Sequence, residues 1–403
     1  MSTSLLYHAF GIRGYRYQRA EFHEGGVVFT IEQDREHLCC SDCGGCDVTL
    51  RGKSERSFRA PPIGGRTVTV NFAVPRVGCL SCGSVRRVAV SFAEGQRQHT
   101  KSFERYVLEL SRLTTILDVA RHLGVSWDFV KEVQKRDLMR RFSRPKLSGL
   151  RLIAIDEIAV RKGHRYLTVV LDLETGAVVF VGDGKGGEAL EPFWRRLRRS
   201  RARLDAVAID MSAAYARAVR THVPTAVLVF DRFHVVKLVN EKLSDLRREV
   251  QRTAEAEEKK VLKGTRWLLL SNPENLDQEK GEPERLQAAL DMNAPLAAAY
   301  YLKEDLRLLW GQASKSAAEK YFEGWLARAR GAGVSTLAGL ADTLDVHREG
   351  ILAWYDHRIT TGPLEGTNNK IKVLKRTAYG FRDTEFFKLK ILALHESRQA
   401  LVG

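Results

Sequence analysis

The chain lacks any long apolar run, and it carries too few acidic residues to balance its basic ones. In its 403 residues, no stretch approaches the roughly 18 apolar residues that a membrane-spanning helix needs, which argues against a transmembrane protein. The amino terminus has no apolar core followed by a small-residue cleavage site, so we do not expect export. Together these absences predict a cytoplasmic protein.

The deficit of acids points to a polyanionic partner. Asp and Glu number 49 against 65 Lys and Arg, which gives a formal net charge of +16. Most of the excess lies in residues 51–150, and a concentrated basic region is typical of proteins that bind nucleic acid.

Cysteine is also scarce, with six residues in the whole chain. Four of them form two C-x-x-C pairs, each followed by glycine: Cys40 with Cys43, and Cys79 with Cys82. In a reducing compartment such pairs are better interpreted as ligands of one structural Zn²⁺ than as disulfides. The alternative is buried cysteines without metal. Cys39 and Cys46 remain as spare ligands.

Strand patterns at residues 26–33 and 66–78 surround these pairs and predict a small zinc-binding β module over residues 1–98. Helical periodicity follows, and residues 99–143 are predicted to form a helix-turn-helix domain. Gly124 ends the first helix of the pair and Ser126 caps the second. Trp127, Lys131 and Lys135 then lie on the recognition side. An ordinary helical hairpin is the other interpretation.

Beyond a linker at residues 141–149, the pattern changes to α/β. Three strands, a helix, a strand, a helix and a strand follow in order, at residues 152–160, 165–173, 177–183, 188–199, 206–210, 213–222 and 226–231. This order predicts an RNase H-like catalytic core over residues 150–234. Residues 235–358 are helical almost throughout and predict an all-α insertion. The core is then completed by residues 359–403.

Two aspartates emerge from apolar strands of this core. Asp156 follows four apolar residues, and Asp210 ends the next buried strand, so each needs a partner or a metal ion. A third carboxylate from a helix would complete a site for two Mg²⁺ or Mn²⁺ ions. Glu365 fits this role, because it is the only acid among the bases of residues 361–376. The alternative is that Glu365 only favours the helix dipole.

The same helix has a basic face. Asn369, Lys372 and Arg376 recur at helical spacing beyond Glu365, so they are predicted to contact the phosphates of a bound DNA strand. The tryptophans of the insertion, Trp267, Trp310 and Trp325, are interpreted as core residues rather than base-stacking residues.

Several strings resemble bacterial insertion-sequence transposases of the ISL-three family. They include VAIDMSAAYARAV, VLVFDRFHVVKLVNEKLSDLRRE and TGPLEGTNNKIKVLKRTAYGFRD, and the resemblance covers nearly the whole chain. It implies a DDE transposase associated with the nucleoid, in which Asp156, Asp210 and Glu365 bind the metal ions. Asp231 and His234 match an auxiliary D-x-x-H motif of related families. Asp231 also ends an apolar strand, so it remains an alternative second acid.

The predicted activity is Mg²⁺-dependent cleavage at terminal inverted repeats of double-stranded DNA, followed by strand transfer into target DNA. Bringing two ends together predicts a homodimer or a larger assembly. Two other functions remain open: a transposase-derived regulator that binds DNA without cutting it, and an RNase H-type nuclease.

Overall fold

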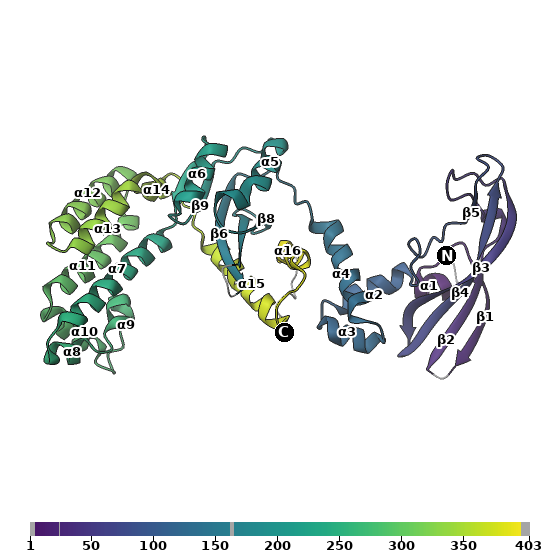
Figure 1. The fold of residues 1–403 in the computed structure, drawn as a ribbon, viewed down its shortest axis with the longest axis horizontal. Helices are drawn as coiled ribbons and strands as arrows, with labels where there is room; N and C mark the ends of the chain where they lie inside the picture. The colour runs from purple at the N-terminus through teal and green to yellow at the C-terminus, as the bar shows by residue number, and fades with distance from the viewer. Residues whose placement is uncertain (1–4, 24, 162–164, 396–403) are drawn as a thin grey trace. The chain divides into compact units, whose positions relative to one another are not determined.

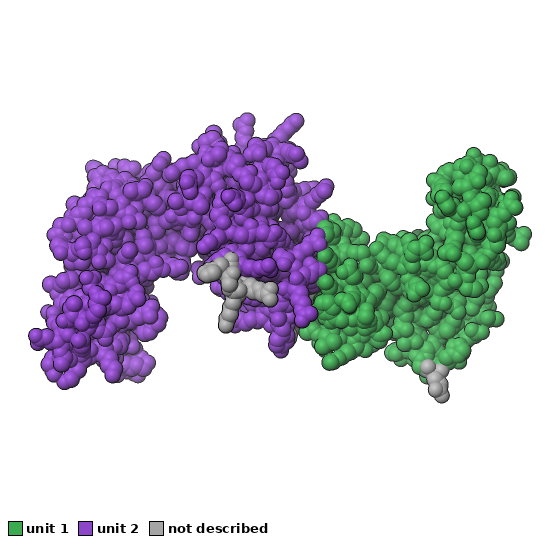
Figure 2. Space-filling model, in the orientation of Figure 1, with its two compact units in different colours: residues 1–141, 397–403 green, residues 142–396 purple. Residues whose placement is uncertain are grey.

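A computed structural model describes residues 5–23, 25–161 and 165–395, so the predicted final segment 359–403 is described as far as residue 395. The chain forms two compact units, one within residues 1–141 and the other of residues 142–396 (Figure 2). The first unit thus holds the regions predicted as the zinc module and the helix-turn-helix, and the second holds the predicted core with its insertion.

The described part of the first unit contains a five-stranded sheet and four α-helices (Figure 1). Its elements are α1 (Leu5–Phe10), β1 (Arg16–His23), β2 (Gly26–Glu32), β3 (Val48–Ile63), β4 (Arg66–Cys79), β5 (Val85–Arg87), α2 (Lys101–Leu110), α3 (Ile116–Leu123) and α4 (Trp127–Phe142). The strands are ordered β1-β2-β4-β3, and β5 pairs with the end of β4. The hairpin of β3 and β4 spans the sequence between the two C-x-x-C pairs.

The helical part of this unit has a core of its own. Val119, Ala120 and Leu123 of α3 pack against Val130 and Val133 of α4, as their periodicity predicted. Gly124 ends α3 with a left-handed φ of 61°, which glycine adopts without steric cost. The hydroxyl of Ser126 accepts a hydrogen bond from the backbone of Phe129 and so caps α4.

The second unit is built around a mixed five-stranded sheet. Its strands are β6 (Leu152–Arg161), β7 (Arg165–Asp172), β8 (Val178–Asp183), β9 (Ala206–Ile209) and β10 (Val227–Phe230). They are ordered β10-β9-β6-β7-β8. β10, β9 and β6 run parallel, whereas β6-β7 and β7-β8 are antiparallel. The predicted strands thus lie within one sheet.

Helices cover this sheet. They are α5 (Glu191–Ser200), α6 (Ala213–His222), α15 (Gly362–Thr377) and α16 (Thr384–Leu392). Ile153 and Ile155 of β6 share a buried cluster with Trp194 of α5 and Tyr215 of α6. Because side chains alternate along a strand, Ala154 and Asp156 point to the opposite face, where α15 packs on β6.

Between β10 and α15 the chain is helical, as predicted. The helices are α7 (Arg232–Thr253), α8 (Ala256–Leu262), α9 (Arg266–Leu270), α10 (Glu282–Asp291), α11 (Ala294–Arg307), α12 (Lys315–Gly331), α13 (Ser335–Val346) and α14 (Arg348–Leu352). Trp310 and Trp325 are buried in their core. The prediction is wrong for Trp267, which is 67% exposed beneath the guanidinium of Arg266. Within the described residues, no helix has the length and apolarity to cross a bilayer.

Candidate functional site

The acids predicted from strand ends lie at one edge of the sheet. The register pairs Ala154 of β6 with Ala208 of β9, and Ile209 of β9 with Phe230 of β10. Continuing this register places Asp156 beside Asp210, and Asp210 beside Asp231. Neighbouring strands lie about 4.8 Å apart, and the alternation of side chains directs all three carboxylates to the face that α15 covers.

Asp156 is held by a residue that sequence reasoning missed. Its Oδ2 accepts a hydrogen bond of 2.8 Å from the amide of Asn368 on α15, and its Oδ1 accepts one of 2.8 Å from the backbone of Glu157. Asn368 is 5% exposed, and its own Oδ1 is buried without a hydrogen-bond partner among the described residues. The only sequence signal was its position three residues after Glu365, one turn along the same helix face.

Burial raises the pKa of Asp156 to about 6, and the charge of Asp210 adds to the rise. The backbone bond from Glu157 and the charge of His234 act in the opposite direction without cancelling it. A carboxylate in this setting lacks full compensation for its negative charge, and a bound cation would supply it.

Asp231 and His234 form a pair at the start of α7. Nδ1 of His234 lies 3.3 Å from Oδ2 of Asp231, and the hydroxyl of Thr361 donates a 2.7 Å hydrogen bond to the same oxygen. Burial alone would raise the pKa of Asp231, but the ion pair with His234 and the hydrogen bond from Thr361 outweigh burial and lower it. The ion pair with Asp231, with the charges of Asp156 and Asp210, raises the pKa of His234. Thr361, also missed, immediately precedes α15 and so ties its start to β10.

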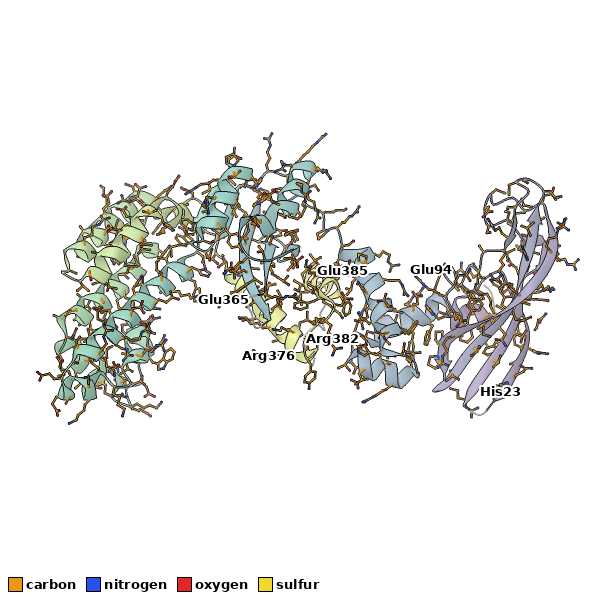
Figure 3. The ribbon with its side chains drawn as sticks, viewed as in Figure 1. His23, Glu94, Glu365, Arg376, Arg382 and Glu385 are labelled. Carbon is orange, nitrogen blue, oxygen red and sulfur yellow. A yellow bond between two sulfur atoms is a disulfide. The ribbon has the colours of Figure 1, made fainter. Side chains whose placement is uncertain are left out.

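Glu365 lies in the first turn of α15, as predicted (Figure 3). Its side chain is exposed, and the carboxylates of Asp156, Asp210 and Glu365 do not all lie within 4.8 Å of one another. A pair of divalent ions does not require that distance. Two ions about 4 Å apart, each about 2.1 Å from its ligands, allow carboxylate oxygens on opposite sides to be about 8 Å apart. The oxygen-only set of side chains suits Mg²⁺ or Mn²⁺.

The basic face of α15 is open to solvent. Asn369, Lys372 and Arg376 are all exposed, and the ammonium of Lys372 donates to the side-chain oxygen of Asn369 at 3.4 Å. In α4, Trp127 is 44% exposed with Lys131 over its ring, whereas Lys131 and Lys135 are half-buried. The predicted recognition side is therefore only partly exposed.

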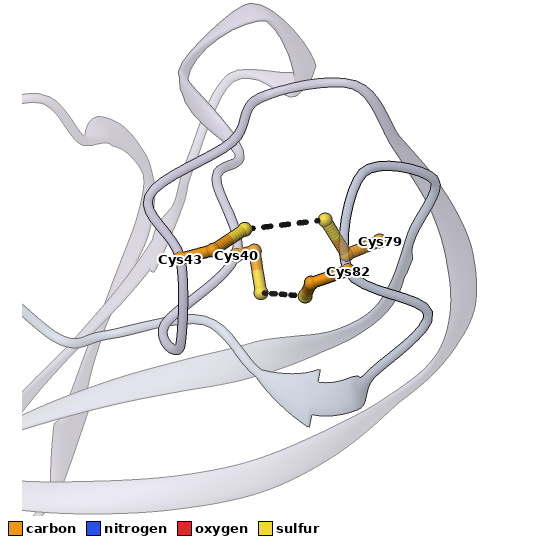
Figure 4. Close-up of side chains that lie close together, drawn as sticks. All are labelled: Cys40, Cys43, Cys79 and Cys82. Atoms are coloured by element: carbon orange, nitrogen blue, oxygen red, sulfur yellow. Dashed lines mark hydrogen bonds between the residues drawn. The ribbon is translucent and has the colours of Figure 1, made fainter.

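The four cysteines of the C-x-x-C pairs converge in the first unit (Figure 4). Their sulfurs all lie within 4.8 Å of one another, with Cys40 and Cys82 at 3.8 Å and Cys43 and Cys79 at 3.5 Å. A tetrahedral ion about 2.3 Å from four thiolates separates them by about 3.8 Å, so this group fits one metal ion.

The surrounding backbone also suits thiolates. The amides of Asp42 and Gly45 donate to the sulfurs of Cys40 and Cys43, each at 3.4 Å. Gly44 and Gly83 close the two turns with left-handed φ values of 75° and 70°, so glycine is needed at both positions. The hydroxyl of Ser84 is the main cause that lowers the pKa of Cys40, to about 6.

The expectation for the two spare cysteines is wrong. Cys39 and Cys46 form a disulfide with each other, so neither is available as an alternative ligand. The loop between them carries Cys40 and Cys43 and folds back on itself, which brings the two flanking residues together. The assumption that all six cysteines are reduced therefore does not hold for this pair.

Comparison with known proteins places these features in a family. Residues 153–391 match a transposase family model, and residues 88–137 match the helix-turn-helix domain of transposase family ISL3. The transposase of insertion sequence element IS1001 from Bordetella parapertussis is 33% identical over 95% of this chain and 96% of its own length. The transposase of element IS1557 from Mycobacterium tuberculosis is 31% identical over 90% of this chain and 87% of its own.

Among solved structures, the Drosophila P element transposase strand transfer complex aligns with 66% of this chain and 81% of its own chain. Its TM-score of 0.34 and identity of 11% are too low to add anything about this chain. The two sequence relatives cover 90% or more of the chain, and the two family models match residues 88–137 and 153–391 within it. The chain therefore belongs to the ISL3 family of transposases.

Proposed function

We propose that this transposase cuts and joins DNA by a DDE mechanism on an RNase H-like core. The observation that carries the proposal is the edge of the sheet where Asp156, Asp210 and Asp231 lie side by side beneath α15. The strand order, with the first strand central and two parallel strands beside it, supports the RNase H-like assignment.

Asp156, Asp210 and Glu365 would hold two Mg²⁺ or Mn²⁺ ions. Such ions activate a water or a 3′-hydroxyl and stabilise the leaving oxygen of a phosphodiester. Asp231 serves as an auxiliary residue, because its Oδ2 is already engaged by His234 and Thr361. The charges of all three aspartates raise the pKa of His234. In this proposal, His234 orients the carboxylates or the scissile phosphate. Asn368 keeps the carboxylate of Asp156 in one orientation.

The first unit supplies recognition. The four-cysteine group binds one Zn²⁺ and holds the ends of β3 and β4 together. The helix-turn-helix binds the terminal inverted repeats through Ser126, which precedes α4, and through Trp127, Lys131 and Lys135 of that helix. On α15, Asn369, Lys372 and Arg376 contact phosphates of the bound strand. Pairing of two ends requires at least a dimer in the active complex.

The test is cleavage of a duplex carrying the end of the element, in the presence of Mg²⁺. We expect Asp156→Asn and Glu365→Gln to abolish cleavage and to leave end binding intact, because each removes a metal ligand and no recognition contact. Glu157→Gln is the matched control, since its side chain lies on the other face of β6, toward Tyr215.

Cleavage that persists in Asp156→Asn, or that is lost equally in Glu157→Gln, would contradict the assignment. If the wild-type protein binds the ends but does not cut them with either Mg²⁺ or Mn²⁺, the protein acts as a DNA-binding regulator. Asp231→Asn compared with Asp210→Asn decides which is the second metal ligand: the ligand variant loses all cleavage, and the auxiliary variant retains a reduced rate.

A further inference from the structure

A pocket lies at the carboxyl-terminal end of α15 and shares Lys372 and Arg376 with the basic face already described. It has a volume of about 300 Å³. Its apolar lining includes Ile158, Val160 and Ile371, and its polar lining consists of Lys372, Lys375 and Arg376. No acid lines it. A small pocket with an apolar floor and three cations suits a planar apolar group attached to a phosphate.

Tyr379 stands on the rim of this pocket and is fully exposed. Its backbone has a φ of +51°, one of only two non-glycine residues with positive φ among the described residues. The amide of Tyr379 donates to the carbonyl of Arg376 at 3.0 Å, and the amide of Gly380 donates to that of Lys375 at 2.9 Å. These two bonds define a Schellman cap with Tyr379 at its left-handed position.

Glycine is the usual residue at that position, because a side chain there crowds the backbone. A tyrosine at this cap therefore strains the backbone, and its exposed ring gains no packing in return. Backbone strain without a packing benefit is a recognised feature of functional positions. The ring, the pocket and the cations all lie in the second unit (Figure 3 labels Arg376).

We propose that this pocket binds one unpaired nucleotide of a DNA strand, with the base stacked on Tyr379 and the adjacent phosphates on Lys375 and Arg376. The proposal rests on the proposed function, since the strand is one that runs along α15 from Glu365. At 1.5 Å per residue, Tyr379 lies about 20 Å along the helix axis from Glu365, which corresponds to about six nucleotides at 3.4 Å each. The pocket therefore holds DNA at a distance from the cleavage point and stabilises a locally unpaired strand.

The test measures binding of the full-length protein to a fluorescein-labelled oligothymidylate and to a blunt duplex of equal length. No Mg²⁺ or Mn²⁺ is added, so no cleavage occurs, and no chelator is used, so the four-cysteine group keeps its metal ion. Stacking on an aromatic residue is tolerant of sequence, so this probe does not depend on the inverted repeat. We expect Tyr379→Gly to weaken oligothymidylate binding about 5- to 150-fold and to leave duplex binding unchanged. Because glycine relieves the cap, we also expect the melting temperature of the second unit to rise by about 2–4 °C.

Two controls sharpen the result. Tyr379→Phe keeps the ring and is expected to bind like the wild type. Tyr301→Ala removes another exposed tyrosine from the same unit, on α11, and is expected to change nothing. If Tyr379→Gly lost single-strand and duplex binding equally, Tyr379 would contribute only to contacts with the DNA backbone, and the proposal would be overturned. Unchanged oligothymidylate binding in that variant would also overturn it. Since no cleavage is measured, the outcome is separate from that of the Asp156 and Glu365 variants.

Discussion

At the scale of single residues, Asn368 is the contact that links α15 to the acidic edge of the sheet. Its amide fixes Asp156, and its buried Oδ1 has no partner among the described residues. We expect Asn368→Ala to weaken Mn²⁺ binding about 10- to 100-fold, because groups that orient a metal ligand contribute on that scale. Paramagnetic resonance of Mn²⁺ titrated into the protein measures the affinity without any DNA cleavage.

The matched control for Asn368 is Thr367→Val on the same helix. Thr367 is also buried, but its hydroxyl bonds only to the carbonyl of Pro363 in its own helix. This variant is expected to bind Mn²⁺ normally and to cleave DNA. If Asn368→Ala bound Mn²⁺ as tightly as the wild type while losing stability, Asn368 would be a packing residue and not part of the metal site.

The acidic edge was predictable from the sequence, whereas the contacts around it were not. A carboxylate after an apolar strand, such as Asp156 or Asp210, is unusual enough to indicate chemistry. An asparagine on a polar helix or a tyrosine just beyond it resembles any surface residue, so neither Asn368 nor Tyr379 could be singled out. Only the packing of α15 on β6 distinguishes Asn368. Only the positive φ at the helix cap and the adjacent pocket distinguish Tyr379.

At the scale of elements, the strands and helices that could be predicted from the sequence were those with periodic hydrophobic residues. The strands and helices of the second unit were found because their buried residues recur at strand or helix spacing. β3 was missed, since most of its first ten residues are exposed and its burial alternates only near its end. Pairing with β4 forms this strand, and such pairing leaves no local sequence signal.

Glu104 connects α2 to α4 and gives a prediction at this scale. Its Oε1 accepts hydrogen bonds from His99 at 2.7 Å and from Arg136 of α4 at 2.8 Å. Burial would raise the pKa of Glu104, but these partners outweigh burial and lower it. We expect Glu104→Gln to reduce the free energy of unfolding of the first unit by about 1–2 kcal/mol at pH 7. Glu109→Gln, at an exposed position of the same helix, serves as the control.

The pH dependence follows from the sign of this shift. A carboxyl whose folded pKa is depressed stabilises the fold fully above its unfolded pKa, near 4.3, and loses that contribution as the pH falls through the lower folded value. The difference in melting temperature between wild type and Glu104→Gln should therefore be constant near neutrality and shrink below about pH 4. A difference that stayed the same into strong acid would show that the ionised form of Glu104 contributes nothing.

At the scale of the whole molecule, the two units have separate hydrophobic cores. One cluster, with Phe58 and Phe72, lies in the sheet of the first unit, and another, with Trp194 and Trp325, lies in the second. The four-cysteine group belongs to the first unit alone. Loss of its metal should therefore affect one unit and spare the other.

We expect calorimetry of the full chain to show two unfolding transitions. A zinc chelator should lower the first unit's transition by about 10 °C, because binding energy at a structural site contributes directly to folding. The second transition should stay in place. Cys82→Ser removes one ligand, so the first transition of this variant should already lie at the lowered temperature and should not respond to the chelator. Elemental analysis should find one zinc ion per wild-type chain. If chelation shifted both transitions equally, the units would not fold independently. If it shifted neither, the four thiols would be a packed cluster that binds no ion.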